Sequence, residues 1–275
     1  MGEPYRDLVE IARDLRRDAI TMIYEGGDGH PGPALSIADI VTALYFRIMR
    51  VDPKRPEWPE RDRLILSKGH ACPIVYASLA RLGFFQGYER PVLRQLGSIF
   101  QGHPDVNKTP GIDMTSGSLG NGLALGLGMA LAGRYNGQDY ITYVICGDGE
   151  TQEGIIWEAA TSAARYGVGR LIAFVDQNGL QSGDSVAEIG GPQPLGPKWE
   201  AFGWHTQKID GHDFGHILAA VEAAQIETER PSVILAHTTK GKGVPFMEND
   251  NAWHKGVPSE AQYQEALRAL GGGVA

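Results

Sequence analysis

The chain has 275 residues, of which 42% are hydrophobic and 21% are charged, and its formal net charge is −8. This length and composition are typical of one large α/β domain or two small ones, and they exclude a disordered or fibrous chain. The negative charge argues against a nucleic-acid partner, because nucleic acids are bound by basic surfaces.

The cysteines and the apolar stretches bear on where the protein resides. Cys72 and Cys146 both lie among apolar residues, which fits a reducing cytoplasm better than a disulfide framework. The start of the chain is a charged amphipathic pattern and not a signal peptide. Residues 123–132 are apolar but interrupted by glycine, and they are too few to cross a bilayer. We therefore expect a cytoplasmic protein with no membrane partner.

Hydrophobic periodicity predicts helices near the start of the chain. Apolar side chains fall on one helical face over residues 5–23. Ser36, with Asp39 three positions later, predicts a capping box that begins a second helix, which runs to about Met49. A third helix is expected at residues 72–83, because it ends at a glycine, which helix C-termini favour.

Further along, apolar runs alternate with helical patterns. Continuous runs of β-branched and apolar residues predict buried strands, because both faces of a parallel sheet are covered. We expect a short strand and turn at residues 63–70, strands at residues 140–146, 171–176 and 232–238, and helices at residues 122–135, 154–166 and 213–227. This alternation predicts a three-layer α/β/α fold around a mostly parallel sheet.

The most informative residues follow two of the predicted strands. Gly147-Asp148-Gly149 comes directly after one strand, and the next ends in Asp176-Gln177-Asn178; positions 150–176, 27 residues, separate Gly149 from Gln177. Ligands of parallel sheets bind outside the carboxyl ends of the strands. A carboxylate, an amide oxygen and a nearby backbone carbonyl suit Mg²⁺ combined with phosphate oxygens. The two glycines let the backbone approach a diphosphate, and the following helix adds N–H donors.

This pattern resembles the fingerprint of thiamine-diphosphate enzymes, in which Gly-Asp-Gly is followed, after about this spacing, by a turn containing Asn. Gln177 departs from that pattern, whereas the final Asn is present. The resemblance makes Asp148 and Asn178 side-chain ligands of Mg²⁺ and Leu180 the backbone-carbonyl ligand, with Ca²⁺ or Mn²⁺ as possible substitutes.

Six motifs, in family order over about residues 26–256, resemble those of the transketolase family. They are Gly29-His30-Pro31-Gly32, Ser67-Lys68-Gly69-His70-Ala71, Gln101-Gly102-His103-Pro104, residues 115–122 (TSGSLGNG), residues 147–154 (GDGETQEG), and Lys240-Gly241-Lys242-Gly243 with Trp253-His254. The resemblance implies a thiamine-diphosphate-binding (PP-type) fold, with residues 1–275 as a single domain.

The resemblance also implies catalytic roles for residues in these motifs. His30, His103 and His254 would face the substrate and handle protons or donor hydroxyls, whereas His70 would contact the diphosphate or the reaction centre. Histidine titrates near neutrality, which suits proton transfer. Glu153 would reach a dimer interface and join an acidic network that links two active sites.

Cofactor contacts are implied for a wider set of residues. Gly117 and Leu119 would present backbone to the aminopyrimidine of thiamine diphosphate. The remaining expected contacts are His70, Gly147, Asp148, Gly149, Glu153, Asn178 and His254. The other histidines match no catalytic motif and are interpreted as structural, with His212 a weak exception because it lies in a turn before a helix. Lys242 is interpreted as a solvated loop lysine.

The family also needs a part that this sequence lacks. In transketolases, the glutamate that activates the aminopyrimidine lies in a pyrimidine-binding domain that follows the part seen here. We expect the pyrimidine-binding and C-terminal domains on a separate polypeptide, with two copies of each chain in the complex (α2β2). A fragment of a longer protein is the alternative, and the natural-looking start and finish of the chain favour the split enzyme.

The function implied is transfer of a two-carbon ketol unit from a ketose phosphate to an aldose, with activity only when the partner is present. Two alternatives stay open: the α subunit of a 2-oxo-acid dehydrogenase, and an inactive scaffold. The Gly-His-Pro-Gly, Lys-Gly-His and Gly-His-Pro motifs argue against the first, and Asp148, Asn178 and the histidines argue against the second. The sequence leaves the donor and acceptor sugars open, including sulfonated ones.

Overall fold

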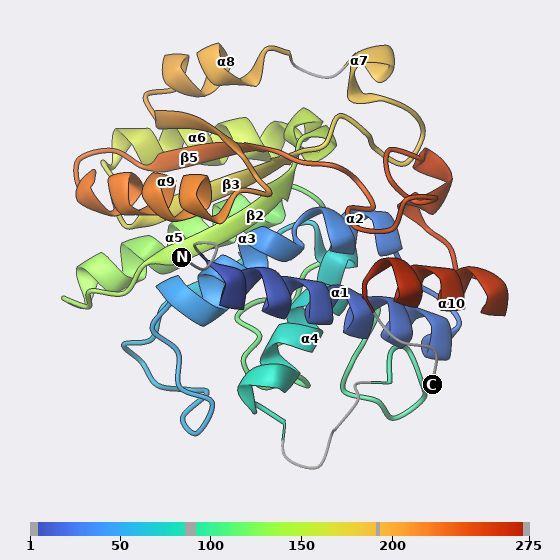
Figure 1. The fold of residues 1–275 in the computed structure, drawn as a ribbon. Helices are drawn as coiled ribbons and strands as arrows, with labels where there is room; N and C mark the ends of the chain where they lie inside the picture. The colour runs from blue at the N-terminus through green and yellow to red at the C-terminus, as the bar shows by residue number, and fades with distance from the viewer. Residues whose placement is uncertain (1–4, 86–91, 191–192, 272–275) are drawn as a thin grey trace.

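A computed structural model describes residues 5–85, 92–190 and 193–271, so both ends of the predicted domain, 1–4 and 272–275, lie outside the described residues. One parallel sheet forms its centre, with the strand order β1-β2-β3-β5-β4 (Figure 1). The strands are β1 (Arg63–Leu66), β2 (Thr142–Gly147), β3 (Leu171–Gln177), β4 (His205–Asp210) and β5 (Ser232–His237).

Helices surround this sheet. The α-helices are α1 (Arg6–Gly26), α2 (Pro31–Ser36), α3 (Ala38–Ala43), α4 (Cys72–Leu82), α5 (Asn121–Tyr135), α6 (Gly154–Arg165), α7 (Val186–Ile189), α8 (Leu195–Ala201), α9 (Phe214–Ile226) and α10 (Glu260–Ala269). Short 3₁₀ turns are η2 (Gly69–Ala71), η3 (Gly149–Gln152) and η4 (Asn251–His254), and η1 (Leu44–Ile48) is a π-helical turn.

The alternation of side chains along each strand produces the layers. On β2, Tyr143 and Ile145 pack against α1, α3, α4 and α9, whereas Val144 and Cys146 pack against α5, α6 and α8. Successive residues of a strand point to opposite faces, so a continuous apolar run serves both helical layers. The prediction of a three-layer α/β/α fold around a parallel sheet is confirmed, and Figure 1 shows the two helical layers.

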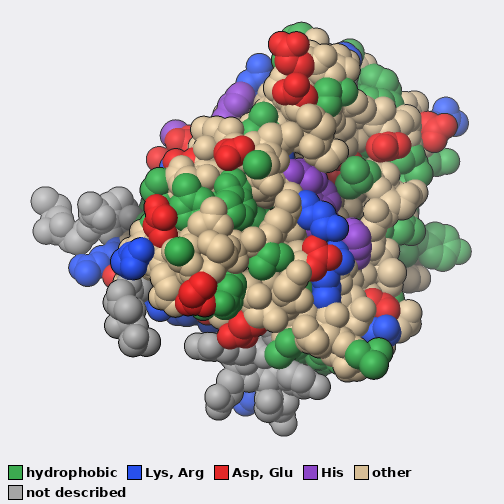
Figure 2. Space-filling view, turned by 90° about the vertical axis from the view of Figure 1, so that its right-hand side faces the viewer, with side chains coloured by type: hydrophobic (Ala, Val, Ile, Leu, Met, Phe, Trp, Pro, Cys, Tyr) green, Lys and Arg blue, Asp and Glu red, His purple; other side chains and the backbone are tan. Residues whose placement is uncertain are grey.

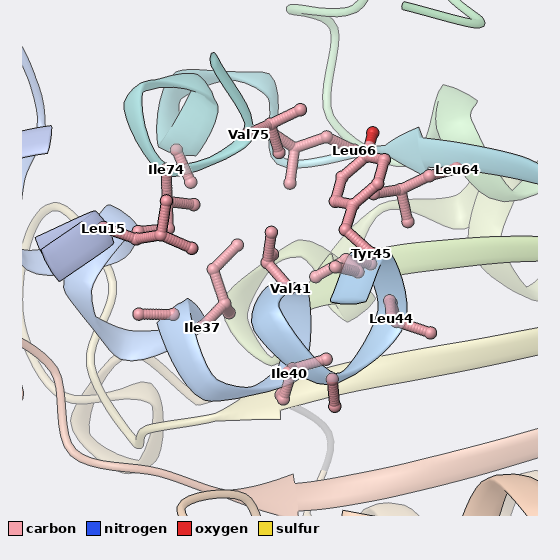
Figure 3. Close-up of a cluster of buried hydrophobic side chains, with 14 of the residues drawn as sticks. Leu15, Ile37, Ile40, Val41, Leu44, Tyr45, Leu64, Leu66, Ile74 and Val75 are labelled. Atoms are coloured by element: carbon pink, nitrogen blue, oxygen red, sulfur yellow. The ribbon is translucent and has the colours of Figure 1, made fainter. Parts of the chain in front are cut away.

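Figure 3 shows part of the layer that holds the N-terminal helices against β1. Leu15 of α1, Val41 of α3 and Ile74 of α4 are buried together with Leu64 and Leu66 of β1. Burial of each such side chain stabilises the fold by roughly 1.5–3 kcal/mol relative to its exposure. This packing positions the turns before α2 and after β1, which carry His30 and His70.

The predicted capping box at Ser36 is wrong. The helix begins earlier, at Pro31, because proline suits the first turn of a helix, and Ser36 is the last residue of α2. The Ser36 hydroxyl donates to Asp176 Oδ1 at 2.6 Å, so it caps no backbone N–H group. Asp39 pairs instead with Arg16, at 2.6 Å from Asp39 Oδ2 to Arg16 Nη2.

The sequence patterns did not predict β4, α7 or α8. β4 is an edge strand whose residues are all intermediate or exposed, so its sequence, HTQKID, lacks the apolar run of a central strand. α7 has four residues, and α8 has seven and contains Pro197, so neither shows a helical period. Elements this short depend on tertiary packing for their stability.

Two expectations drawn from composition can be compared with the coordinates. Cys72 and Cys146 are both free thiols and both buried. Burial raises the pKa of the Cys72 thiol to about 12, which makes it unreactive near neutral pH. Within residues 5–85, 92–190 and 193–271, no helix combines the length and apolar character needed to cross a membrane.

Two glycines in α5 provide a test of its packing against β2. A methyl group at Gly126 would lie 2.6 Å from Val144 Cγ2, whereas one at Gly128 would meet nothing within 4 Å. Overpacking costs about 1–3 kcal/mol and Ala gains about 1 kcal/mol over Gly in a helix, so we expect Gly126→Ala to destabilise the chain and Gly128→Ala to stabilise it. Urea unfolding of the isolated chain measures both, and equal effects would contradict this packing.

Candidate active site

A cavity of about 480 Å³ lies at the carboxyl edge of the sheet, where β1, β2, β3 and β5 end. It is lined by every residue that the sequence placed in the site: His30, His70, His103, Gly117, Leu119, Gly147, Asp148, Gly149, Glu153, Asn178, Leu180 and His254. Figure 2 shows histidine, basic and acidic side chains gathered along a hollow on one face of the molecule. The structure therefore brings together segments that are up to 224 positions apart, from 30 to 254.

A buried ion pair forms the floor of this cavity. Lys68 Nζ, from the turn after β1, lies 2.5 Å from Asp176 Oδ2 near the end of β3, and both residues are almost fully buried. Asp176 Oδ1 accepts hydrogen bonds from the hydroxyls of Ser36 and Thr238. Lys68 lowers the pKa of Asp176, which keeps this carboxylate ionised despite its burial. Neither Lys68 nor Asp176 was assigned a role from the sequence, although both lie in motifs that it singled out.

Asp176 also orients the predicted metal ligand Asn178. Asn178 Nδ2 donates to Asp176 Oδ2 at 2.7 Å, and Asn178 Oδ1 accepts from the Leu180 N–H at 3.0 Å. Asp148 Oδ2 accepts from the Gly179 N–H at 2.7 Å, so the carboxylate contacts the turn that carries Asn178 and Leu180. The three predicted ligands therefore belong to one connected cluster.

The chemistry of this cluster fits a divalent cation. Burial and the neighbouring charge of Asp176 raise the pKa of Asp148 to about 6, so a cation beside these carboxylates would relieve an unfavourable interaction. Carboxylate, amide and carbonyl oxygens are the ligands that Mg²⁺ takes in proteins. Among the described residues, no group of three or more His, Cys, Asp or Glu could hold a metal ion, so the site depends on its amide and its backbone carbonyl.

Backbone approach at the Gly-Asp-Gly turn is enforced by close packing. A methyl group at Gly149 would lie 2.6 Å from Gln181 Oε1, so a larger residue would displace the 178–181 turn. The turn continues as the short 3₁₀ segment η3, and α6 begins only at Gly154. Glu153 is consequently the N-cap residue of α6, and not one turn into a helix as the sequence pattern indicated.

Glu150, a further buried carboxylate, ties the loops around the cavity together. Its Oε1 accepts from the Ser67 hydroxyl and from the Gly120 N–H, and its Oε2 accepts from the Gly147 N–H at 2.9 Å. Burial raises its pKa, and the hydrogen bonds oppose that effect. The Gly-Asp-Gly-Glu motif contains this residue, but the sequence alone did not assign it a role.

Three histidine rings meet at the other side of the cavity. The centroid of the His30 ring is 5.0 Å from that of His70 and 5.6 Å from that of His254, and His70 is 5.2 Å from His254. His103 lies near Gly117, where an added methyl group would be 3.4 Å from His103 Cγ. All four histidines expected to be catalytic are thus in one cavity, whereas His205 and His216 are not among its lining residues.

The expectation that these histidines titrate near neutrality is wrong for this chain. Burial, followed by nearby cations, lowers the pKa of His30 to about 4, of His70 to about 2 and of His254 to about 3. Burial and Arg94 lower the pKa of His103 as well. At neutral pH these rings are uncharged, so each offers one donor and one acceptor nitrogen.

Lys240 sets the tautomer of His254. Its Nζ lies 3.0 Å from His254 Nδ1, and an ammonium can only donate, so Nδ1 accepts and the ring proton resides on Nε2. Burial lowers the pKa of Lys240 to about 8, and the residue lies 3.5 Å from the carbonyl oxygens of Leu180 and Gln181. The sequence analysis considered Lys242 in this motif, but Lys242 lies in a different hollow, near Glu248.

His212 has the structural role that most of the non-motif histidines were given. Its Nε2 accepts from the Thr239 N–H at 2.8 Å, so Nδ1 carries the proton and donates to Asp39 Oδ2 at 2.7 Å. Arg16 and His212 together lower the pKa of Asp39 to about 2 despite its burial. This network holds the loop that precedes Lys240.

Comparison with known proteins agrees with the fold and the motifs. The family described as "Transketolase, thiamine diphosphate binding domain" matches residues 6–272. A 6-deoxy-6-sulfo-D-fructose transketolase subunit from Clostridium sp. (strain MSTE9) is 44% identical over 270 residues, 98% of each chain. One of the two subunits of an apulose-4-phosphate transketolase from Phocaeicola vulgatus is 40% identical over 93% of this chain and 90% of that protein.

Solved transketolases share the fold. The transketolase from Campylobacter jejuni has a TM-score of 0.92 and 31% identity, and the match covers 99% of this chain but 43% of that one. The transketolase from Leishmania mexicana gives a TM-score of 0.91 with 28% identity and 42% coverage of its chain. This chain thus spans about two fifths of those proteins. The chain belongs to the transketolase family, and its relatives of similar length place it with the subunits of split transketolases.

Replacing Lys68 tests the buried ion pair. Lys68→Met leaves the Asp176 carboxylate buried without its cation, so we expect a loss of roughly 3 kcal/mol in the free energy of unfolding at pH 7. Lys68 lowers the pKa of Asp176, so the pair stabilises above the pKa of an unfolded Asp, and its contribution is lost as the pH falls through the lower, folded value. The deficit of the variant should therefore shrink toward pH 4, where its unpaired Asp176 is protonated.

Chemical denaturation at pH 7 and pH 4 measures this effect. Lys108→Met is the matched control, because Lys108 forms an exposed pair with Asp105 at 3.9 Å, and such pairs contribute about 0–1 kcal/mol. Equal losses for the two variants, or a deficit for Lys68→Met that grows at low pH, would contradict the role given to this pair.

Proposed function

We propose that this chain is the diphosphate-binding subunit of a split transketolase, in which it holds thiamine diphosphate through Mg²⁺ and works only with a pyrimidine-binding partner. The observation that carries the proposal is the single cavity that unites the Asp148, Asn178 and Leu180 oxygens with His30, His70, His103 and His254. A metal-bound diphosphate and a reacting sugar need these two kinds of group side by side.

Three contacts would hold the cofactor's diphosphate. Mg²⁺ bound by Asp148, Asn178 and the Leu180 carbonyl would link the phosphates to the protein, and Ca²⁺ or Mn²⁺ could replace it. The Lys240 ammonium, 1% exposed in the same cavity, adds a positive charge. Gly147 and Gly149 leave room for close approach. When bound, thiamine diphosphate supplies the electron sink for carbon–carbon bond cleavage.

The histidines would act on the sugar as neutral groups. His254 presents the Nε2 proton that Lys240 fixes, and can donate it to a hydroxyl or carbonyl oxygen of the donor. His30 Nδ1 is buried and finds no partner among the described residues, so it can exchange a hydrogen bond with bound substrate. His70 would lie nearest the diphosphate, and His103 would complete the wall toward Gly117.

The outer edge of the cavity supports a partner polypeptide. Leu119 lines the cavity and is 37% exposed, and Glu153 beside it is also exposed. We infer that the aminopyrimidine would rest here and that the partner would cover it, with Glu153 at the interface and an α2β2 complex as the assembly. Residues 1–275 would form one PP-type domain in that complex. The free, buried cysteines favour a cytoplasmic location.

Similar-length relatives act, by name, on sulfofructose and on apulose 4-phosphate. We infer that the donor of this enzyme is likewise a ketose with an anionic terminal group, either a phosphate or a sulfonate. No observation favours the 2-oxo-acid dehydrogenase or the scaffold alternative, because the relatives are named transketolase subunits and the cavity contains the whole predicted set of residues.

Reconstitution tests the proposed function. The isolated chain should show no ketol transfer, and addition of the pyrimidine-binding partner should produce thiamine-diphosphate-dependent transfer from a phosphorylated or sulfonated ketose. Coupled assays of aldose release measure the rate, and Asp148→Ala in the same complex should abolish it. Ketol transfer by the chain alone would disprove the split enzyme, and decarboxylation of 2-oxo acids by the complex would disprove the transketolase assignment.

The pH dependence of metal binding tests the role of Asp148. Its pKa of about 6 means that it must lose a proton before it binds a cation, so Mn²⁺ affinity should fall by roughly tenfold from pH 7 to pH 5. The pKa values of His30, His70 and His254 lie at about 4 or below, so these rings stay neutral over that range.

Electron paramagnetic resonance of free Mn²⁺ measures the binding without the cofactor, whose phosphates also titrate. Asp148→Asn should bind no Mn²⁺ in this range, whereas Asp184→Asn, in an exposed position of the following loop, should behave as the wild type. An affinity that does not change between pH 7 and pH 5 would rule out Asp148 as a ligand.

A further inference from the structure

Arg94 lines the cavity although no motif of the sequence marked it. Its backbone is left-handed, with φ 59, a conformation that side chains larger than glycine rarely adopt. Such a conformation persists only where the surroundings impose it, and here the Arg94 N–H bonds to the Phe100 carbonyl at 2.9 Å. The adjacent Leu93 is buried, and its carbonyl oxygen would lie 2.7 Å from a methyl group at Gly26. The backbone of Arg94 is therefore fixed between α1 and the loop before His103.

The guanidinium of Arg94 contacts both turns that carry cavity histidines on this side. Its Nη1 donates to Asp28 Oδ2 at 2.7 Å, two residues before His30. Its planar carbon packs on Gly102, directly before His103, where an added methyl group would lie 2.3 Å from Arg94 Cζ. Gly102 is thus required by the guanidinium. A single side chain bridges residues 28 and 102, which precede two histidines 73 positions apart, 30 to 103.

The same side chain faces the two rings with a positive charge. Six groups face His30: Arg94, Lys255, His103, Asp28, His70 and His254. Arg94 is the largest charge effect on the pKa of both His30 and His103, after burial, and it lowers both. Asp28 opposes this effect at His30, and it also lies 3.6 Å from Lys255 Nζ.

We propose that Arg94 is a positioning residue that clamps the His30 and His103 turns at a fixed separation and holds both rings in their neutral form. It acts through these histidines and not by bonding to the reacting atoms. The inference rests on the proposed transketolase function for its effect on rate, whereas the geometry of the two turns and the ionisation of the rings are properties of the chain itself.

Three variants separate the clamp from the charge. Arg94→Met removes both, Arg94→Lys keeps the charge but cannot reproduce a planar fork, and Gly102→Ala displaces the guanidinium without altering any charge. Arg81→Met is the control, because Arg81 forms an exposed pair with Asp14 away from the cavity. Thermal unfolding of each chain establishes that the variants are folded before their activity is compared.

In the reconstituted complex, we expect Arg94→Met, Arg94→Lys and Gly102→Ala to lower kcat by about tenfold or more, because a misplaced catalytic group loses rate steeply with distance. The Kd for thiamine diphosphate should stay within about twofold of the control, since the diphosphate ligands are untouched. In histidine NMR titrations of the full chain, the midpoints of His30 and His103 should move to higher pH in Arg94→Met and stay low in Arg94→Lys.

Two results would overturn the proposal. One is a kcat for Arg94→Met equal to that of Arg81→Met, and the other is complete restoration of kcat by Arg94→Lys, which would show that charge alone is needed. Unchanged histidine midpoints in Arg94→Met would likewise refute the electrostatic half of the proposal. A wild-type complex without ketol transfer would refute the proposed function instead, and the titrations of the chain would still decide the ionisation of the rings.

Discussion

The ammonium of Lys68 and the carboxylate of Asp176 lie 2.5 Å apart beneath the cavity, and the rest of the site is arranged around this pair. Asp176 accepts hydrogen bonds from four residues in separate segments: Ser36, Lys68, Asn178 and Thr238. Each donor comes from a different loop, because the carboxyl ends of parallel strands converge at one edge of the sheet. A buried charge with several donors specifies one arrangement of those loops, since any other would leave it uncompensated.

The charges of the cavity follow a clear division. Carboxylates lie on one side, where Asp148 has its pKa raised by burial and by Asp176. Cationic Arg94, Lys240 and Lys255 also line the cavity, and between these groups the histidines stay neutral because burial and nearby cations disfavour their charged form. This division suits a ligand that brings a cation and an anion together, as a metal-bound diphosphate does. It also leaves neutral donors and acceptors available for sugar hydroxyls.

The comparisons explain why this arrangement is only part of an active site. Solved transketolases contain this fold within chains more than twice as long, whereas the relatives of similar length are named as subunits. A cavity with Leu119 exposed at its edge is consistent with a wall supplied by another polypeptide. The diphosphate end and the aminopyrimidine end of the cofactor would then be recognised by different chains, so that assembly of the complex controls activity.

Much of the fold could be predicted from the sequence, because its strongest signals are local. Buried strands are continuous apolar runs and glycines mark turns, so β2, β3, β5 and α4 were predicted within a few residues. β4 was missed, since an edge strand needs no apolar run, and the start of α2 was misplaced because Ser36 donates its hydrogen bond to a residue 140 positions away.

The motifs also identified residues that share the cavity, because each motif joins a chemically distinctive side chain to a rigid turn. What only the tertiary structure decided is how those side chains are charged and connected. Lys240 rather than Lys242 faces the cavity, Asp176 is the centre of the hydrogen-bond network, and Arg94 bridges two histidine turns. Ionisation depends on burial and on charges contributed by distant segments, and neither is present in a local pattern.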